Sequence, residues 1–368
     1  MAKSPQKVAL ITTPSLNQSF NVSGVSSVVR GIIDSCRGGE WAFQPVIIGK
    51  SDNRRRGIVW ALDQLSVPFR FLGAVMHCRP RLIHINGPLS SLAILRDAVL
   101  LVLARFYSRN VVYHLHGGLY VSTKPRSRLL EQIISGMLSL PGLVLVLGEQ
   151  EAESITRLYG ANKARVRVLP NAVTMPQTVQ KRERQGPLKV LSLGRISPEK
   201  GIDVLCAAFE QDPYLRSDVI LHMYGAGPLE DELVPRLEIT LGSSFHFGGV
   251  AHEAERDAAY AWADVIVVPS RYGEGLPMAL LEAMAAGVVP IATADGMITN
   301  VVSHGETGYI IEKNSPTALR DALKIALQAK EGGALKSVSS RTREIVSRRH
   351  SMRSYARTLE RYYRDVQS

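Results

Sequence analysis

The sequence predicts an α/β protein with two domains, each built around a doubly wound parallel sheet. Its 368 residues exceed the size at which a single hydrophobic core usually stops growing. Short and nearly continuous apolar segments recur along the chain, and such segments are typical of strands buried on both faces of a parallel sheet. Segments with helical periodicity lie between several of them, which is the alternation of βαβ units.

The first domain is predicted over residues 1–178. Its expected helices include those around residues 26–36 and 129–140. After Asn171 the chain becomes polar and rich in Pro and Gly up to Pro187, which indicates a linker. The expected strands are residues 8–12, 43–48, 81–85, 110–115 and 143–147.

The second domain is predicted over residues 179–345, and a terminal helix over residues 346–368. Apolar residues of the terminal segment fall on one helical face with arginines opposite, which predicts an amphipathic helix. The expected strands are residues 189–193, 219–224, 244–247, 265–268 and 288–292. The apolar face of the terminal helix comprises Met352, Tyr355, Ala356, Leu359, Tyr362 and Tyr363.

The amino-acid composition favours a protein with two hydrophobic cores and argues against disulfide-rich, zinc-binding and membrane-spanning proteins. Hydrophobic residues make up 45% of the chain, enough for two cores. The three scattered cysteines, Cys36, Cys78 and Cys206, argue against a disulfide framework or a cysteine-based zinc site and favour a reducing cytosol. The start of the chain reads as a first strand rather than a secretory signal, and the apolar stretch 92–104 is interrupted by charge, so we expect no membrane-spanning helix.

Charge is divided unevenly between the two halves. Residues 1–180 carry 21 Lys and Arg against 9 Asp and Glu, a net charge of +12, whereas residues 181–368 carry 23 against 24. Scattered charge is usually just solvated surface, but this asymmetry suggests an anionic partner for the first domain. Aromatic residues are only 6% and do not interleave with the basic clusters, so we expect no nucleic acid as a partner.

Two glutamates flank a Gly-Leu-Pro turn in the second half. Glu274 follows the strand that Pro269 stops, so it lies in a loop at the carboxyl edge of the sheet, where open α/β sheets bind ligands. Glu282 follows about two turns into an apolar helix. Taken alone, both would be ordinary surface charges. However, a glutamate within so apolar a helix is costly without a partner, so we infer a polar ligand there.

These glutamates belong to a larger pattern. The segment 271–283 resembles the E-x7-E signature of retaining, nucleotide-sugar-dependent glycosyltransferases of family four. Residues 195–201, Arg-Ile-Ser-Pro-Glu-Lys-Gly, resemble the R-x4-K element of that family, residues 169–171 its V/I-P-N turn and residues 225–229 its G-x-G-P-L strand end. Residues 247–250, 282–287 and 305–308 continue the similarity in the family's order, most densely between about residues 166 and 311.

The resemblance implies a GT-B fold, with two Rossmann-like domains facing an interdomain cleft and the terminal helix crossing back onto the first domain. A nucleotide-diphosphate sugar would be the donor substrate, with no other cofactor. Arg195 and Lys200 would stabilise the departing diphosphate, aided by the dipole of the following helix. With these cations, no metal is required.

Further donor contacts follow from the same resemblance. Glu282 would accept both ribose hydroxyls, and Glu274 would accept hydroxyl hydrogen bonds from the transferred sugar. The amides of Gly275 and Leu276 would contact the diphosphate or the sugar. Val250 lies where the family's main chain recognises the base.

The first domain would supply the other wall of the site. His116 matches a family histidine that precedes a glycine and reaches the donor sugar, while His114 is expected to be a core residue. A third metal ligand with suitable spacing is not evident.

Gly24 would allow close approach to the donor phosphate or acceptor, although the family's Gly-Gly loop is reduced here to one glycine. Glu149 either shapes the acceptor side or is an exposed helix start.

The resemblance therefore implies a retaining glycosyltransferase, and because no residue is an obvious enzymic nucleophile we expect it to act by front-face attack. The expected acceptor is a glycan or a lipid-pyrophosphate-linked glycan of a bacterial surface polysaccharide. We expect a cytoplasmic protein, with an anionic membrane surface as a candidate partner of the basic half. The alternatives are another GT-B enzyme such as an epimerase, or a non-catalytic descendant that binds a nucleotide or membrane.

Overall fold

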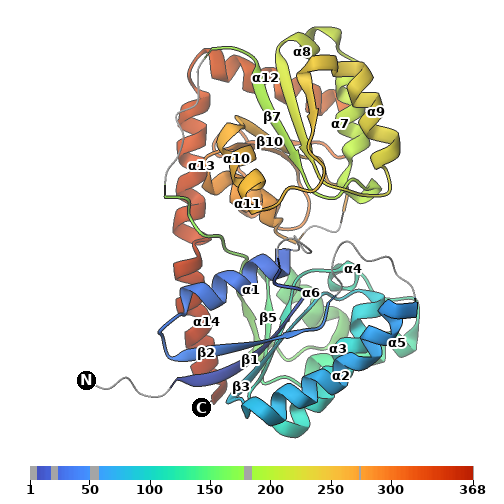
Figure 1. The fold of residues 1–368 in the computed structure, drawn as a ribbon, viewed down its shortest axis with the longest axis vertical. Coiled ribbons are helices and arrows are strands. Elements are labelled where there is room, and N and C mark those ends of the chain that lie inside the picture. Colours follow the sequence, from blue (N-terminus) through green and yellow to red (C-terminus); the bar gives the residue numbers. More distant parts are fainter. Residues whose placement is uncertain (1–5, 18–23, 50–57, 178–184, 273–274, 368) are drawn as a thin grey trace. The chain divides into compact units, whose positions relative to one another are not determined.

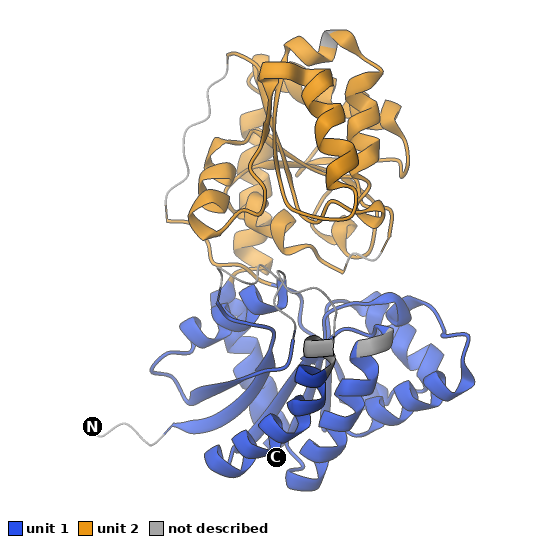
Figure 2. Cartoon of the chain, turned by 45° about the vertical axis from the view of Figure 1, so that its right-hand side comes forward, with its two compact units in different colours: residues 1–171, 352–368 blue, residues 172–351 orange. Residues whose placement is uncertain are grey.

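The computed structural model describes residues 6–17, 24–49, 58–177, 185–272 and 275–367. The chain divides into two compact units (Figure 2). Unit 1 comprises residues 1–171 together with residues 352–368, and unit 2 comprises residues 172–351. The last helix of the chain is thus a part of unit 1.

Unit 1 has a six-stranded, all-parallel sheet among its described residues, with helices packed against it (Figure 1). The strand order is β2-β1-β3-β4-β5-β6. The strands are β1 (Lys7–Thr13), β2 (Trp41–Ile47), β3 (Leu82–Gly87), β4 (Val111–Leu115), β5 (Leu143–Val146) and β6 (Val166–Val168). The helices are α1 (Gly24–Ser35), α2 (Ile58–Cys78), α3 (Ser91–Tyr107), α4 (Leu119–Ser122), α5 (Arg128–Ser139), α6 (Glu149–Tyr159) and α14 (Met352–Gln367), with a 3-10 turn at Lys163–Arg165.

Helix α14 is packed into the core of unit 1. Tyr363 is fully buried, and its ring meets Trp41 edge-to-face with 5.1 Å between the ring centroids. The Tyr363 hydroxyl also lies 2.5 Å from Nδ1 of His84, in β3. Met352 at the start of the helix is buried close to Gly31 of α1. The amphipathic pattern of the sequence is therefore used to complete the core around β1, β2 and β3.

Unit 2 repeats the architecture with its own six-stranded parallel sheet in the described part of the chain. The strand order is β12-β11-β10-β7-β8-β9. The strands are β7 (Leu188–Leu193), β8 (Val219–Tyr224), β9 (Phe245–Phe247), β10 (Val265–Val268), β11 (Val289–Thr293) and β12 (Tyr309–Ile311). The helices are α7 (Ile202–Glu210), α8 (Pro213–Ser217), α9 (Glu230–Leu241), α10 (Glu253–Trp262), α11 (Met278–Ala285), α12 (Pro316–Glu331) and α13 (Leu335–Arg349), with 3-10 turns at Pro198–Lys200, Gly242–Ser244 and Ile298–Asn300.

The predicted α/β class is confirmed, and each predicted strand overlaps an observed one. The sequence did not predict β6 and β12, which have only three residues each. It also did not predict α2, and it gave the segment around residues 92–104 no secondary structure, whereas this segment forms most of α3. Among the residues that the structure describes, no helix is both long and apolar enough to cross a membrane.

Candidate functional site

The strand order of unit 2 defines where a ligand is expected. The chain begins at the central β7, continues outward through β8 and β9, and then returns to β10 on the other side of β7. Between β7 and β10 the sheet therefore has a topological switch point, and ligands of doubly wound sheets bind at the carboxyl ends of the strands there. Arg195 follows β7 and Arg271 follows β10, so the R-x4-K element and the E-x7-E segment both begin at this edge of the sheet.

The backbone around Arg195 is fixed by close packing of two turns. The amide of Gly194 donates to the carbonyl of Tyr224 over 3.0 Å, and that of Ile196 donates to Ala226 over 3.1 Å. A Cβ on Gly225 would lie only 1.8 Å from the Gly194 carbonyl oxygen, which explains the glycine after β8. The Arg195 side chain is 68% exposed, and its guanidinium lies 3.7 Å from the Glu199 carboxylate. It is thus available to an anion at the sheet edge.

Lys200 lies beside the amino end of α7. It ends the 3-10 turn Pro198–Lys200 and is followed by Gly201, whose φ of +67° suits glycine. A Cβ on Gly201 would come within 2.2 Å of the carbonyl oxygen of Pro269, directly after β10. This close approach brings the Lys200 loop against the strand end that leads into the E-x7-E segment. The partial positive charge of the α7 amino terminus adds to the lysine there.

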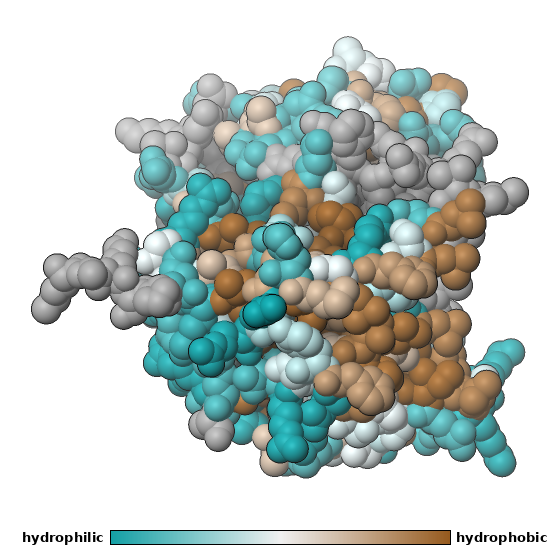
Figure 3. All heavy atoms as spheres, turned by 60° about the horizontal axis from the view of Figure 1, so that its bottom comes forward, coloured by the Kyte–Doolittle hydropathy of each residue, from teal (hydrophilic) through white to brown (hydrophobic). Residues whose placement is uncertain are grey.

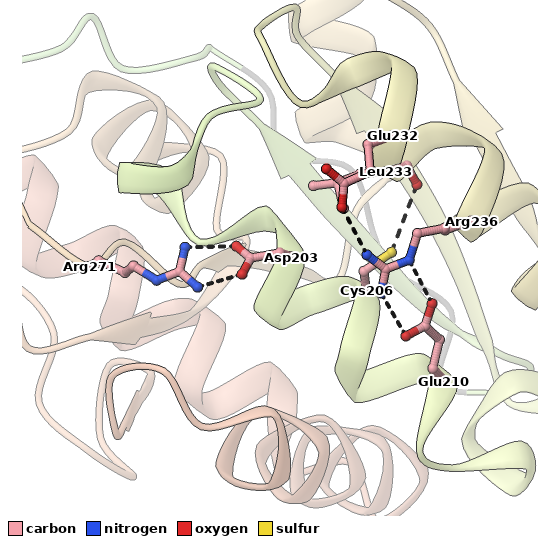
Figure 4. Close-up of polar contacts among 7 residues, drawn as sticks. All are labelled: Asp203, Cys206, Glu210, Glu232, Leu233, Arg236 and Arg271. Atoms are coloured by element: carbon pink, nitrogen blue, oxygen red, sulfur yellow. Dashed lines mark hydrogen bonds and ion pairs between the residues drawn. The ribbon is translucent and has the colours of Figure 1, made fainter.

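Arg271 fastens these two loops together (Figure 4). Its guanidinium forms a bidentate pair with Asp203 in the first turn of α7, at 2.8 and 2.5 Å. It also donates to the Pro198 carbonyl and to Asn314, and its backbone amide donates to Glu199. The hydrogen bonds that Arg271 donates to the Asp203 carboxylate raise the pKa of Arg271 above its ordinary value. Arg271 is therefore a positioning residue that holds the motif loops in register.

The other ion pair of α7 offers a contrast, also drawn in Figure 4. At the far end of the helix, Arg236 of α9 binds Glu210 through Nε at 3.0 Å and through a terminal nitrogen at 2.9 Å. It also lies 3.3 Å from Glu232. Between the two pairs, the buried Cys206 thiol faces the Leu233 carbonyl at 3.8 Å. This cluster ties α7 to α9 toward the carboxyl end of α7, away from Asp203 at its start.

Glu282 has partners within the protein. In α11, its Oε2 accepts a hydrogen bond of 2.9 Å from the Tyr260 hydroxyl and lies 3.2 Å from Nε of Arg256. Both partners belong to α10, and the Glu282 side chain is only 17% exposed. Burial and the carboxylate raise the pKa of Tyr260 well above its ordinary value, so its hydroxyl remains a donor. Arg256 and Tyr260 thus supply the partners that a carboxylate in this apolar helix needs, so the ribose contact expected of Glu282 stays a prediction that its burial alone does not support.

The turn between Glu274 and α11 is only partly described. Glu274 itself lies outside the described residues. Gly275 is partly buried, and its carbonyl accepts a hydrogen bond of 2.9 Å from the amide of Met297. Leu276 is buried, and Pro277 leads directly into α11. The Gly-Leu-Pro turn thus anchors the amino end of α11, because the Leu276 side chain is buried in the hydrophobic core of unit 2.

Val250 follows the edge strand β9 and is half-buried. The preceding turn is tied inward, because the Gly249 carbonyl accepts a hydrogen bond of 2.6 Å from the Gly225 amide. The turns after β7, β8 and β9 are therefore linked in series from Arg195 to Val250.

In unit 1, His116 lies at the carboxyl end of β4. Its Nε2 is 2.8 Å from Oδ1 of Asn86, whose amide nitrogen donates to the Thr12 carbonyl over 2.8 Å. Because the amide nitrogen of Asn86 faces a carbonyl, its Oδ1 faces the imidazole and can only accept. Nε2 of His116 therefore carries the proton, and Nδ1 is left as an acceptor. Asn86 and Thr12 fix this tautomer from β3 and β1.

Three imidazoles form a row that runs from β3 through β4 to this strand end. The ring centroids of His84 and His114 are 5.5 Å apart, and those of His114 and His116 are 4.1 Å apart. Burial lowers the pKa of His84 to about 3 and that of His116 to about 4, and the pKa of His114 falls well below its ordinary value. All three are therefore neutral at pH 7. His114 is fully buried, in agreement with its prediction as a core residue.

Gly24 is the first residue of α1, and the loop after β1 is bound to this helix. The Ser26 hydroxyl donates to the Ser15 carbonyl over 3.0 Å, and Arg30 donates to the Leu16 carbonyl over 3.0 Å. Glu149 begins α6 and is exposed. No cluster of three or more His, Cys, Asp and Glu side chains within the described ranges is arranged to hold a metal ion.

Several residues that build the site were not predicted from the sequence. Asp203, Arg256, Tyr260 and Asn86 act on a motif residue that lies well away from them along the chain. A weak signal was present for one pair, since Arg256 and Tyr260 are spaced i, i+4 and so share one face of α10.

Comparison with known proteins identifies the family. The family model described as "Glycosyl transferases group 1" matches residues 176–345, and the model described as "Glycosyl transferase 4-like domain" matches residues 49–172. A WcaL glycosyltransferase of Salmonella typhimurium, named for colanic acid biosynthesis, is 31% identical over 47% of this chain and 44% of its own. The lipopolysaccharide 1,2-N-acetylglucosaminetransferase of the same organism is 30% identical over 46% of each chain. The chain thus spans about half the length of the curated relatives it matches.

Solved structures are similar over nearly the whole chain. Sucrose-phosphate synthase from Thermosynechococcus elongatus has a TM-score of 0.78 at 20% identity and covers 98% of this chain and 99% of its own. Alr3699/HepE from Anabaena, solved in complex with UDP, has a TM-score of 0.73 at 16% identity, with 98% and 100% covered. These likenesses show the GT-B fold. With the two family models together spanning most of its length, the chain belongs to the family-four glycosyltransferases of GT-B fold.

Proposed function

We propose that this protein is a retaining glycosyltransferase that moves a sugar from a nucleotide-diphosphate sugar to a glycan or a lipid-linked glycan. The observation that carries the proposal is the cationic edge at the switch point of unit 2. There, exposed Arg195 and partly buried Lys200 flank the amino end of α7, directly beside the strand end that leads into the E-x7-E segment.

This arrangement suits the chemistry of the leaving group. As the glycosidic bond to the donor sugar breaks, the diphosphate gains negative charge, and fixed cations placed there lower the barrier. Arg195 supplies a forked donor and Lys200 a point charge. Because these side chains and the α7 dipole neutralise the leaving group, the reaction needs no divalent metal.

The remaining donor contacts surround this edge. Glu282, oriented by Arg256 and Tyr260, accepts the ribose hydroxyls, and Glu274 accepts hydroxyl hydrogen bonds from the transferred sugar. The amides of Gly275 and Leu276 bind the diphosphate or the sugar. The main chain at Val250 recognises the base.

Unit 1 contributes a neutral group to the reaction. The unprotonated Nδ1 of His116 accepts a hydrogen bond from a hydroxyl of the transferred sugar, while Asn86 holds the ring. Gly24 gives the donor phosphate or the acceptor access to the start of α1. The acceptor hydroxyl attacks on the face from which the diphosphate leaves. Its proton passes to the departing phosphate, so the configuration at the anomeric carbon is retained.

The proposed setting is assembly of a bacterial surface polysaccharide at the inner face of the cytoplasmic membrane. Two relatives are named for colanic acid biosynthesis and for lipopolysaccharide synthesis. The excess positive charge of residues 1–180 favours a lipid-pyrophosphate-linked acceptor in an anionic membrane.

A nucleotide-release assay tests the proposal. The purified chain is incubated with UDP-, GDP-, ADP- and dTDP-sugars, with and without EDTA, and liberated nucleoside diphosphate is measured. We expect slow release from one class of donor, unchanged by EDTA and faster with a suitable acceptor. If no donor is turned over with any acceptor, the transferase assignment fails. Epimerised sugar nucleotide as the product would identify an epimerase instead, and binding without turnover would identify a non-catalytic protein.

A further inference from the structure

Helix α2 exposes a stripe of large apolar side chains. Leu62, Leu65, Phe69 and Met76 are all exposed, with Phe69 at 76% and Leu65 at 69%. Their spacing of three, four and seven residues places them along one face of the helix. The opposite face supplies core residues such as Phe71, so α2 is apolar on both sides. The fold uses only the buried face of α2, so the exposed apolar stripe has no role in the core of unit 1.

Helix α3 has a matching stripe. Leu95, Val99, Val102 and Phe106 are spaced four, three and four residues apart and are all exposed, with Phe106 at 86%. Helices α2 and α3 pack next to each other. Figure 3 shows a broad hydrophobic area on the face of unit 1 that carries them. We call the eight side chains of the two stripes the α2–α3 face. A continuous apolar area of this kind marks a protein or membrane contact.

The α2–α3 face has almost no negative charge. Between residues 58 and 109 the sequence contains two carboxylates, Asp63 and Asp97. Asp63 is paired with Arg70 at 2.8 Å, and the buried Asp97 is paired with Arg96 at 2.7 Å. No carboxylate in this segment therefore opposes an anionic surface.

Four exposed arginines gather where α2 and α3 end. Arg79 and Arg81 precede β3, while Arg105 and Arg109 precede the neighbouring β4. These two strand starts are adjacent, because Asn110 donates to the Arg81 carbonyl over 3.1 Å and accepts from the Ile83 amide over 3.0 Å. None of the four arginines forms an ion pair with another described residue. They form a basic rim beside Met76 and Phe106.

We propose that the α2–α3 face docks on an anionic lipid bilayer. The apolar stripes enter the boundary between headgroups and acyl chains, and the basic rim binds anionic headgroups. A second copy of this chain is a poorer occupant, because a two-fold contact would bring like-charged rims together with no carboxylates to pair them. This inference deepens the proposed lipid-linked acceptor and rests on that proposal for its purpose. Its test measures binding without turnover, so either proposal can fail alone.

The experiment is co-sedimentation of the full chain with vesicles. We expect binding to vesicles that contain phosphatidylglycerol, little binding to pure phosphatidylcholine vesicles, and release by salt. The triple variant Leu65→Ser, Phe69→Ser, Phe106→Ser should bind at least about thirtyfold more weakly, since three large apolar side chains no longer insert. Because all three side chains are exposed, the variant should keep the wild-type melting temperature.

Matched controls separate this face from general surface effects. Ile239→Ser removes an equally exposed apolar side chain, at 87%, from α9 of unit 2, and should bind like the wild type. Arg79→Gln with Arg105→Gln should weaken binding by about fivefold per charge. Arg353→Gln, on the exposed side of α14, should leave binding unchanged.

Three results would overturn the proposal. The first is equal vesicle binding by the triple variant and the Ile239→Ser control. The second is equal binding of the wild type to neutral and anionic vesicles. The third is a wild-type dimer in sedimentation that the triple variant dissociates, which would assign the α2–α3 face to a second copy.

Discussion

The carboxyl ends of the two sheets are built from different chemistry. In unit 2 the edge is charged, with Arg195 and Lys200 at the switch point and an Arg271–Asp203 pair that fastens the loops. In unit 1 the corresponding edge carries a neutral imidazole, that of His116, which is fixed through Asn86. The charged side chains and the neutral imidazole thus belong to separate sheets, so the roles proposed for them can be tested one at a time.

Removing a positive charge from the carboxyl edge of the unit 2 sheet should lower activity more than any other change considered below. We expect Lys200→Ala to lower kcat/KM by about a hundredfold or more, because a fixed donor to the leaving group is removed. The measurement is steady-state release of nucleoside diphosphate from the active donor. Lys336→Ala, at an exposed position of α13, serves as the control and should match the wild type. An equal, small effect of both variants would contradict the role given to the charged edge.

The two glutamates should differ in what they control. Glu282→Ala should raise the Kd for the nucleoside diphosphate by roughly tenfold to a hundredfold, because charge-assisted hydrogen bonds are lost. Glu274→Ala should lower kcat by about as much and change the Kd little, since its proposed contact is with the transferred sugar and not with the nucleotide. Calorimetry with the nucleotide and kinetics with the donor separate the two. Similar and negligible effects of both changes would refute the assignment.

At the neutral edge, Asn86→Leu tests how His116 is positioned. We expect kcat/KM to fall by roughly tenfold, because the imidazole is no longer held in one tautomer and orientation. Nitrogen-15 NMR of His116 should show the Nε2-protonated form in the wild type and a mixture in the variant. A variant that loses activity but keeps the wild-type tautomer would show that Asn86 acts only through packing.

Breaking the Arg271–Asp203 pair should lower the stability of the protein more than breaking the Arg236–Glu210 pair at the other end of α7. Arg271→Ala removes a bidentate pair and further hydrogen bonds, and we expect a loss of about 2 kcal/mol in the free energy of unfolding. Arg236→Ala, the matched control, breaks a more exposed pair and should cost less than about 1 kcal/mol. Urea unfolding of both variants measures the difference. Equal losses would show that the Arg271 pair has no special role.

The smallest expected effect is a pH dependence from His116. Its folded-state pKa of about 4 lies below the unfolded value, so the neutral ring contributes stability above pH 6.5 that is lost as the pH falls toward 4. Between pH 6.5 and 5.5 the wild type should lose about 1 kcal/mol relative to His116→Asn. Unfolding of both proteins at each pH measures this. A constant difference would mean that the imidazole titrates normally.

Apart from the three-residue strands β6 and β12, the strands were predictable because each is a short apolar run, whereas the helices α2 and α3 were not predicted. Both helices are apolar on the buried face and also along the α2–α3 face, as buried Phe71 and exposed Phe69 show for α2 and buried Leu101 and exposed Phe106 show for α3. The contrast between faces that identifies an amphipathic helix is therefore missing. The exposed apolar stripes therefore explain both why the two helices were not predicted and why we propose a membrane contact for them.

The site was predictable only in part, for a related reason. Arg195 and Lys200 lie within one short motif, so their spacing was sufficient. The partners of Glu282 could not be predicted, because Arg256 and Tyr260 come from another helix and only the fold brings them close to it. For the same reason Asn86, thirty residues before His116, carried no signal in the sequence.

The place of α14 has a consequence for how the protein is made. Unit 1 contains the first 171 residues, yet Tyr363 near the end of the chain covers Trp41 and His84. During synthesis on the ribosome, these early residues remain uncovered while the whole of unit 2 is translated. Unit 2, a continuous segment, can complete its core before unit 1 does. The half made first is therefore the half that finishes folding last.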